Sequence, residues 1–118
     1  MSQQADAPAV DFVRRHIEAY STGDLDTARG NLADNVQADT NDVHLDGVEA
    51  YMEGLARFAA ILEPGSLHVL AARGDEHKAI IMTEHTAFGQ PLPSARTFEL
   101  DENGKITAER VVFFGLAV

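Results

Sequence analysis

The order of helical and strand-like stretches along the chain limits its fold more than any other feature. Up to Gly65 the sequence carries three stretches with helical spacing of apolar residues, and after Gly65 every apolar stretch resembles a strand. Helices followed by strands are typical of an α+β domain, in which helices cover one face of a mostly antiparallel sheet. We therefore expect an α+β fold with three N-terminal helices packed on a curved sheet.

Short signals in the sequence mark where the helices begin and end. The first helix is expected over residues 8–20, where apolar side chains repeat at helical spacing and Pro8 suits the first turn. Gly23 should end this helix, and Asp24 should cap a shorter second one. A third helix is expected over residues 48–62, before Pro64.

The strands are separated by residues typical of tight turns. A short strand is expected over residues 35–40, and the polar stretch 41–47 is expected to be a turn. The Gly, Pro, Asn and Asp residues after Gly65 divide the rest into four antiparallel strands. These are expected over residues 66–72, 78–88, 94–100 and 106–117.

Length and charge exclude several classes of protein. The 118 residues suit one domain, 1–118, in which residues 1–7 are expected to form a flexible N-terminus. The net charge of −10 disfavours nucleic acids and anionic membranes as partners. The chain has no cysteine, no visible signal peptide and no apolar run long enough to span a membrane. We expect a cytoplasmic protein without disulfides.

Three motifs occur in the order found in a known superfamily. The stretches "YSTGDLDTARGNLADNV", "DGVEAYMEGL" and "ENGKITAERVVFFGL" resemble the opening helices, third helix and final strand of the nuclear transport factor two-like superfamily. The resemblance implies a SnoaL-like, cystatin-like α+β cone, with a strongly bent sheet around the first helix and a pocket between helices and sheet. The superfamily includes isomerases, epoxide hydrolases, dehydratases, cyclases and proteins without chemistry, so fold alone does not assign the function.

The catalytic residues of two enzymes of this superfamily are missing. Ketosteroid isomerases use a tyrosine, a carboxylate base and a second acid, and these positions fall on His16, Thr40 and Arg96. Asp39 and Asp42 flank the base position and would reach the pocket only if the strand shifted. The sequence therefore lacks the steroid isomerase set.

Limonene-epoxide hydrolases activate water with an arginine and two aspartates. In the resembling segments "EHTA" and "ERVVF" these positions hold His85, Ala87 and Val111. Alanine and valine cannot activate a water molecule, so that mechanism is excluded as well.

The resemblance and the alternation of strand residues predict a mostly apolar pocket. The side chains expected to line it are Phe12, Tyr20, Thr40, Tyr51, Leu55, Phe58, Thr83, Arg96, Phe98, Val111 and Phe113.

Three titratable residues are the candidate catalytic groups. Glu109 lies among apolar neighbours, and a buried carboxylate needs a partner or becomes neutral. Glu109 could act as a general acid or base with His85 or His16 as its proton partner. Alternatively, Glu109 forms an ion pair with Arg96 or reaches solvent, and the histidines are satisfied within the core.

No cofactor or metal is expected. His44 lies among Asp39, Asp42 and Asp46, but their spacing fits no common ligand pattern, and a solvated acidic loop is the alternative. A different surface is expected on the outer side of the sheet, where an apolar stripe favours a homodimer. This stripe consists of Ile80, Met82, Phe88, Val112 and Phe114.

Two functions remain open from the sequence. The first is an isomerase, cyclase or dehydratase that transfers protons on a hydrophobic small molecule. The second is a module of the same fold that binds a small ligand or dimerises without chemistry.

Overall fold

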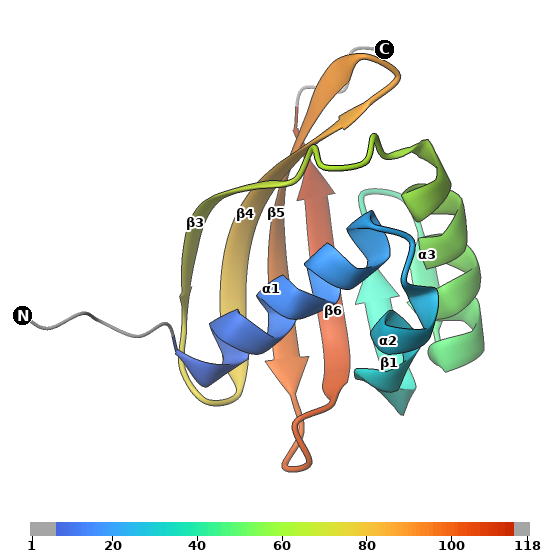
Figure 1. Cartoon of the computed structure of the whole chain (residues 1–118). Coiled ribbons are helices and arrows are strands. Elements are labelled where there is room, and N and C mark those ends of the chain that lie inside the picture. The colour runs from blue at the N-terminus through green and yellow to red at the C-terminus, as the bar shows by residue number, and fades with distance from the viewer. Residues whose placement is uncertain (1–6, 115–118) are drawn as a thin grey trace, which may run out of the picture.

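The computed structural model describes residues 7–114, which form three helices and six strands (Figure 1). Residues 1–6 and 115–118 lie outside the described residues, and with them most of the expected flexible N-terminus and the end of the last expected strand. The elements are α1 (Pro8–Ser21), α2 (Leu25–Gly30), β1 (Leu32–Asp39), β2 (His44–Asp46), α3 (Val48–Ile61), β3 (His68–Gly74), β4 (Lys78–Ala87), β5 (Gln90–Leu100) and β6 (Ile106–Phe113).

All six strands belong to one curved sheet in the order β2-β1-β6-β5-β4-β3. Neighbouring strands are antiparallel except for β1 and β6, which are parallel. The helices lie on one side of the sheet, where α1 contacts β3 and β4 and α3 contacts β1 and β2 (Figure 1). The predicted α+β cone is therefore confirmed, with one parallel pair that was not expected.

The helix ends follow the predicted signals. Gly23 follows α1 with a φ of 88°, a left-handed conformation that glycine adopts without strain. Asp24 then caps α2 by accepting a hydrogen bond from the Thr27 amide at 3.2 Å. Within residues 7–114, no helix is long and apolar enough to cross a membrane.

The stretch expected to be a turn at residues 41–47 contains a strand, so that expectation is wrong. β2 pairs with β1 over only three residues, with Ala38 opposite Leu45, and residues 40–43 form the tight connection. A strand this short carries too little alternation to be recognised in the sequence. Its position matters because it adds Leu45 beside α3.

The connection between β4 and β5 is shorter than expected. Ala87 pairs with Gln90, so the turn consists of Phe88 and Gly89 alone, and both have positive φ values of 54° and 73°. Positive φ at both central residues is what a two-residue hairpin turn of type I′ requires. Gln90–Leu100 is therefore one strand, and Phe88 is part of a turn rather than of the outer sheet face.

A bulge in β6 decides which of its side chains face the helices. Ile106 pairs with Leu100 and Ala108 with Glu99, which leaves Thr107 as an extra residue. The extra residue shifts the alternation, so Ile106 and Glu109 are both buried.

The outer face of the sheet exposes apolar side chains. Ile80, Met82, Val112 and Phe114 are exposed by 39–55%. The homodimer expected through this face stays a prediction, and these are the side chains that a second copy would cover.

Candidate functional site

A pocket of about 260 Å³ lies between α3, the β1–β2 connection and the inner face of β5 and β6. Its walls are mainly aliphatic and aromatic. Thirteen residues line it: Ala38, Thr40, Val43, Leu45, Tyr51, Gly54, Leu55, Arg57, Phe58, Arg96, Glu109, Val111 and Phe113.

Helical and strand periodicity bring these side chains together. Tyr51, Leu55 and Phe58 lie at steps of four and three residues on one face of α3. Gly54 lets α3 approach β2 closely, because a Cβ atom there would lie 2.9 Å from Leu45 Cδ1. On β6, the bulge at Thr107 directs every second side chain from Glu109 onward to the pocket.

A buried ion pair forms the polar part of the pocket wall. Arg96 Nη1 donates to Glu109 Oε2 at 3.0 Å, and the two side chains are only 4% and 5% exposed. The Arg96 guanidinium carbon lies 5.5–6.0 Å from the ring centroids of Phe58, Phe113 and Tyr20. The aromatic rings and the carboxylate together compensate the buried positive charge.

Several polar atoms near this ion pair have no partner. Among residues 7–114, Arg96 Nε, Arg96 Nη2 and Tyr20 Oη are buried without a hydrogen bond. Burial without a partner is costly for such groups, and native proteins contain few of them. The two Arg96 nitrogens are donors that lie behind the surface of the pocket wall.

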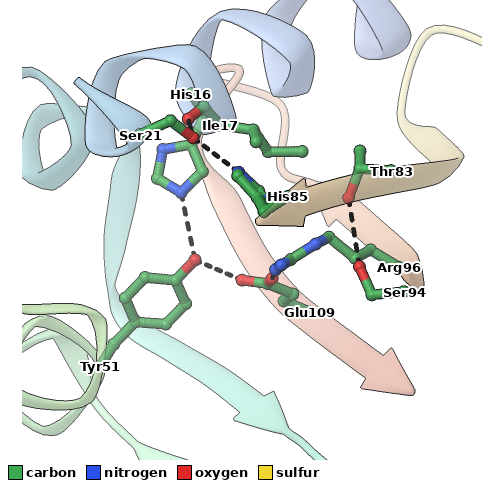
Figure 2. A network of polar contacts seen from close by, with 9 residues as sticks. All are labelled: His16, Ile17, Ser21, Tyr51, Thr83, His85, Ser94, Arg96 and Glu109. Carbon is green, nitrogen blue, oxygen red and sulfur yellow. Dashed lines mark hydrogen bonds and ion pairs between the residues drawn. The ribbon is translucent and has the colours of Figure 1, made fainter. Parts of the chain in front are cut away.

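A chain of hydrogen bonds leads from Glu109 to α1 (Figure 2). Tyr51 Oη donates to Glu109 Oε1, His16 Nε2 lies 3.1 Å from Tyr51 Oη, and Asn31 Nδ2 lies 3.2 Å from His16 Nδ1. The Asn31 Nδ2 atom can only donate, so His16 Nδ1 is the acceptor. The His16 proton therefore resides on Nε2 and points at Tyr51. The proton positions in this chain therefore have one consistent arrangement, with Glu109 as the final acceptor.

His16 and Tyr51 are held in their neutral forms. Burial, together with the nearby Arg96 cation, lowers the pKa of His16 from 6.5 to about 3. Burial and the Glu109 carboxylate raise the pKa of Tyr51 well above its usual value. At neutral pH, Tyr51 is therefore a hydrogen-bond donor and His16 an uncharged imidazole.

His85 lies apart from this chain. Its Nε2 is 2.8 Å from Ser21 Oγ, and the Ser21 hydroxyl donates to the Ile17 carbonyl at 2.6 Å (Figure 2). His85 Nε2 therefore carries the proton and donates it to Ser21. Burial, with a contribution from Arg96, lowers the pKa of His85 to about 4. This histidine is satisfied within the core.

The residues named from the sequence fall into two groups. Those at the pocket are Thr40, Tyr51, Leu55, Phe58, Arg96, Glu109, Val111 and Phe113. Those that lie in or against the core instead of at the pocket wall are Phe12, His16, Tyr20, Thr83, His85 and Phe98. Thr83 makes a core contact, with its hydroxyl 3.1 Å from Ser94 Oγ. His16 still reaches the pocket indirectly, through Tyr51.

The sequence analysis missed Ala38, Val43, Leu45, Gly54 and Arg57 as lining residues. Val43 and Leu45 depend on the position of β2, which the sequence did not reveal. Gly54 and Arg57 lie three residues apart on α3 and so reach the same side of the pocket, but the apolar periodicity that identified Phe58 gives no signal for a glycine or an arginine.

The acidic loop contains a hydrogen bond between His44 and Asp39. His44 Nδ1 lies 2.6 Å from Asp39 Oδ1, and both side chains are about half exposed. Within the described part of the chain, no three His, Cys, Asp or Glu side chains are grouped so that they could hold a metal ion.

The chain matches the model of a known protein family. A family model described as a SnoaL-like domain matches residues 13–109, which is most of the chain. The chain belongs to the SnoaL-like family. No protein of curated function matches this SnoaL-like chain significantly.

Several solved structures share the fold of the SnoaL-like chain. A protein from Kribbella flavida is 26% identical with a TM-score of 0.83, over 90% of this chain and 86% of that chain. An NTF2-like protein of unknown function from Cytophaga hutchinsonii is 18% identical with a TM-score of 0.73, over 94% of both chains. A steroid delta-isomerase from Pseudomonas aeruginosa is 13% identical with a TM-score of 0.76, over 98% of this chain and 85% of that chain. The match to the SnoaL-like family model, together with this shared fold, confirms the resemblance to the nuclear transport factor two-like superfamily.

Proposed function

We propose that this SnoaL-like protein binds a small, largely apolar molecule in the pocket between α3 and β6. The observation that carries the proposal is a pocket of about 260 Å³ with apolar walls that ends at the buried pair of Arg96 and Glu109. Apolar walls with a few fixed polar groups are typical of small-molecule sites.

The volume limits the size of the ligand. An apolar cavity of roughly 150 Å³ is sufficient for benzene. The pocket is larger, at about 260 Å³, and therefore suits a molecule of one or two rings. A four-ring steroid would require the pocket to open further.

Binding has more support than the proton transfer considered from the sequence. Glu109 accepts a hydrogen bond from Arg96 on one oxygen and from Tyr51 on the other, so both of its oxygens are occupied by contacts within the protein. The two candidate proton partners, His16 and His85, are neutral, lie away from the pocket wall and make no hydrogen bond to Glu109. The fold shared with a steroid delta-isomerase supports the architecture and leaves that activity unassigned.

Ligand binding should change the NMR signals of backbone amides that line the pocket. In a ¹H–¹⁵N NMR titration with one- and two-ring compounds, we expect shifts at the amides of Thr40, Val43 and Val111 as a ligand binds. The variant Val111→Phe should weaken binding at least tenfold, because Val111 lines the pocket and a phenyl group there would occupy ligand space.

The control for this titration is the adjacent residue of the same strand. Val112 is 48% exposed on the opposite face of β6, so Val112→Phe adds the same volume outside the pocket. Binding should be unchanged in Val112→Phe. Equal binding by the wild type and Val111→Phe, or the absence of shifts at the pocket amides with every compound, would refute the proposed function.

A further inference from the structure

The charges that line the pocket differ in sign from the charge of the whole protein. The chain carries nineteen acidic and nine basic residues, a net charge of −10. Of the charged residues that line the pocket, two are basic, Arg57 and Arg96, and one is acidic, Glu109. The pocket lining is therefore positive by one charge in a strongly acidic protein, and charges of one sign in a low-dielectric cleft attract ligands of the other sign.

Arg57 supplies the uncompensated charge. Glu109 balances Arg96 through the buried ion pair, whereas Arg57 makes no ion pair or hydrogen bond with any residue between 7 and 114. Its side chain is exposed on α3 and also contributes to the pocket wall, which places it at the rim. The acidic side chains of the adjoining loop, Asp39 and Asp42, do not line the pocket, and Asp39 is paired with His44.

The buried ion pair at the end of the pocket offers no free acceptor to a ligand that brings donors. Both oxygens of Glu109 already accept hydrogen bonds. In contrast, Nε and Nη2 of Arg96, a residue only 3% exposed, are donors without a partner in the described chain. A cationic ligand would add further donors where donors already exceed partners.

We propose that the pocket selects an amphipathic carboxylic acid of one or two rings, bound as its anion with the carboxylate on Arg57. The apolar body would lie along Leu55, Phe58 and Phe113. This inference rests on the proposed function and names the chemical class of its ligand. Arg57 is the better carboxylate partner because it has no ion-pair partner among residues 7–114 and lies close to solvent, whereas a carboxylate at Arg96 would add a second negative charge beside the buried Glu109.

The test compares two probes of the same shape, one anionic and one neutral. 2-Naphthoate and its neutral isostere 2-naphthamide have the same two-ring body, and both are titrated into the full-length protein by NMR at pH 7.5. We expect 2-naphthoate to bind about fivefold more tightly than 2-naphthamide, the preference that one exposed ion pair provides. Arg57→Gln should remove this preference, because it should weaken the binding of 2-naphthoate more than that of 2-naphthamide.

A matched variant separates the local charge of Arg57 from the charge of the whole protein. Arg73 is exposed on β3, at the sheet edge farthest from β2, and Arg73→Gln changes the net charge by the same amount. The preference for 2-naphthoate should persist in Arg73→Gln. Loss of the preference in both variants, or its persistence in Arg57→Gln, would overturn the role of Arg57.

The two probes test binding in the pocket and selection for an anion separately. If both probes bind in the pocket with equal affinity, the proposed function holds and the selection for an anion is wrong. If neither probe shifts the pocket amides, the proposed function fails for two-ring ligands and this inference fails with it.

Discussion

At the scale of single residues, the stability of the site depends on charges that compensate one another. Arg96 and Glu109 are almost completely buried, and each is the only ion-pair partner of the other among the described residues. Removing one member of a buried pair leaves an uncompensated charge, which is far more costly than replacing both by apolar groups.

We expect Glu109→Gln to lower the free energy of unfolding by about 3 kcal/mol or more, because the Arg96 cation stays buried without its counter-ion. The double variant Arg96→Met/Glu109→Gln should be more stable than Glu109→Gln alone, since it removes that cation as well. Urea denaturation followed by circular dichroism measures both. A double variant that is less stable than the single one would contradict the role of the pair as mutual compensation.

At the scale of elements, the turn of the β4–β5 hairpin requires positive φ at two residues, and one of them is a phenylalanine. Phe88 has a φ of 54° and is 79% exposed, so it occupies a left-handed conformation with little packing in return. Aromatic residues rarely adopt this conformation, which asparagine and glycine tolerate well. The neighbouring Gly89 satisfies the same turn without strain.

Phe88→Asn should therefore stabilise the protein by about 0.5–1 kcal/mol, because asparagine suits the first position of a type I′ turn. Thermal denaturation would show the gain as a higher Tm. Gln90→Asn is the control, since Gln90 pairs with Ala87 within the strands and does not form the turn. A lower Tm for Phe88→Asn would show that the exposed ring contributes more to stability than its strained backbone costs.

At the scale of the whole molecule, the buried histidines connect folding to pH. In the folded state the pKa is about 3 for His16 and about 4 for His85, against 6.5 for an ordinary histidine. Between about pH 6.5 and pH 4 the unfolded chain binds two protons, one at each of these histidines, that the folded chain does not. Stability is therefore fully present above pH 6.5 and decreases as the pH falls toward 4.

Each histidine should contribute a slope of about 1.4 kcal/mol per pH unit in this range. Urea denaturation at pH 7.5, 6.0 and 5.0 measures the slope. The variant His85→Gln should reduce it to about half, whereas His77→Gln, at an exposed turn position, should leave it as in the wild type. A wild-type stability that does not change between pH 6.0 and 5.0 would contradict this account.

The sequence predicts features that depend on neighbouring residues better than features that depend on distant pairing. Periodicity and caps predict the three helices and most strands, because apolar spacing, Gly23 and Asp24 act locally. The bulge at Thr107 leaves no comparable local signal, since it reflects pairing with β5, yet it determines that Glu109 faces the pocket. Likewise, the sequence suggested an Arg96–Glu109 pair, whereas the bond from Tyr51 joins residues 58 positions apart and depends on the packing of α3.

The parallel pairing of β1 with β6 has a consequence for the order of events during synthesis. β1 ends at Asp39, but its neighbour in the main sheet begins only at Ile106, almost at the end of the described chain. Contacts so distant in sequence form late, because a long loop must close first. On the ribosome, the hairpins of β3, β4 and β5 can form before β6, the parallel neighbour of β1, has been synthesised. β6 thus joins the two parts of the sheet and completes the pocket wall, so the nascent chain has no binding site until β6 has left the ribosome.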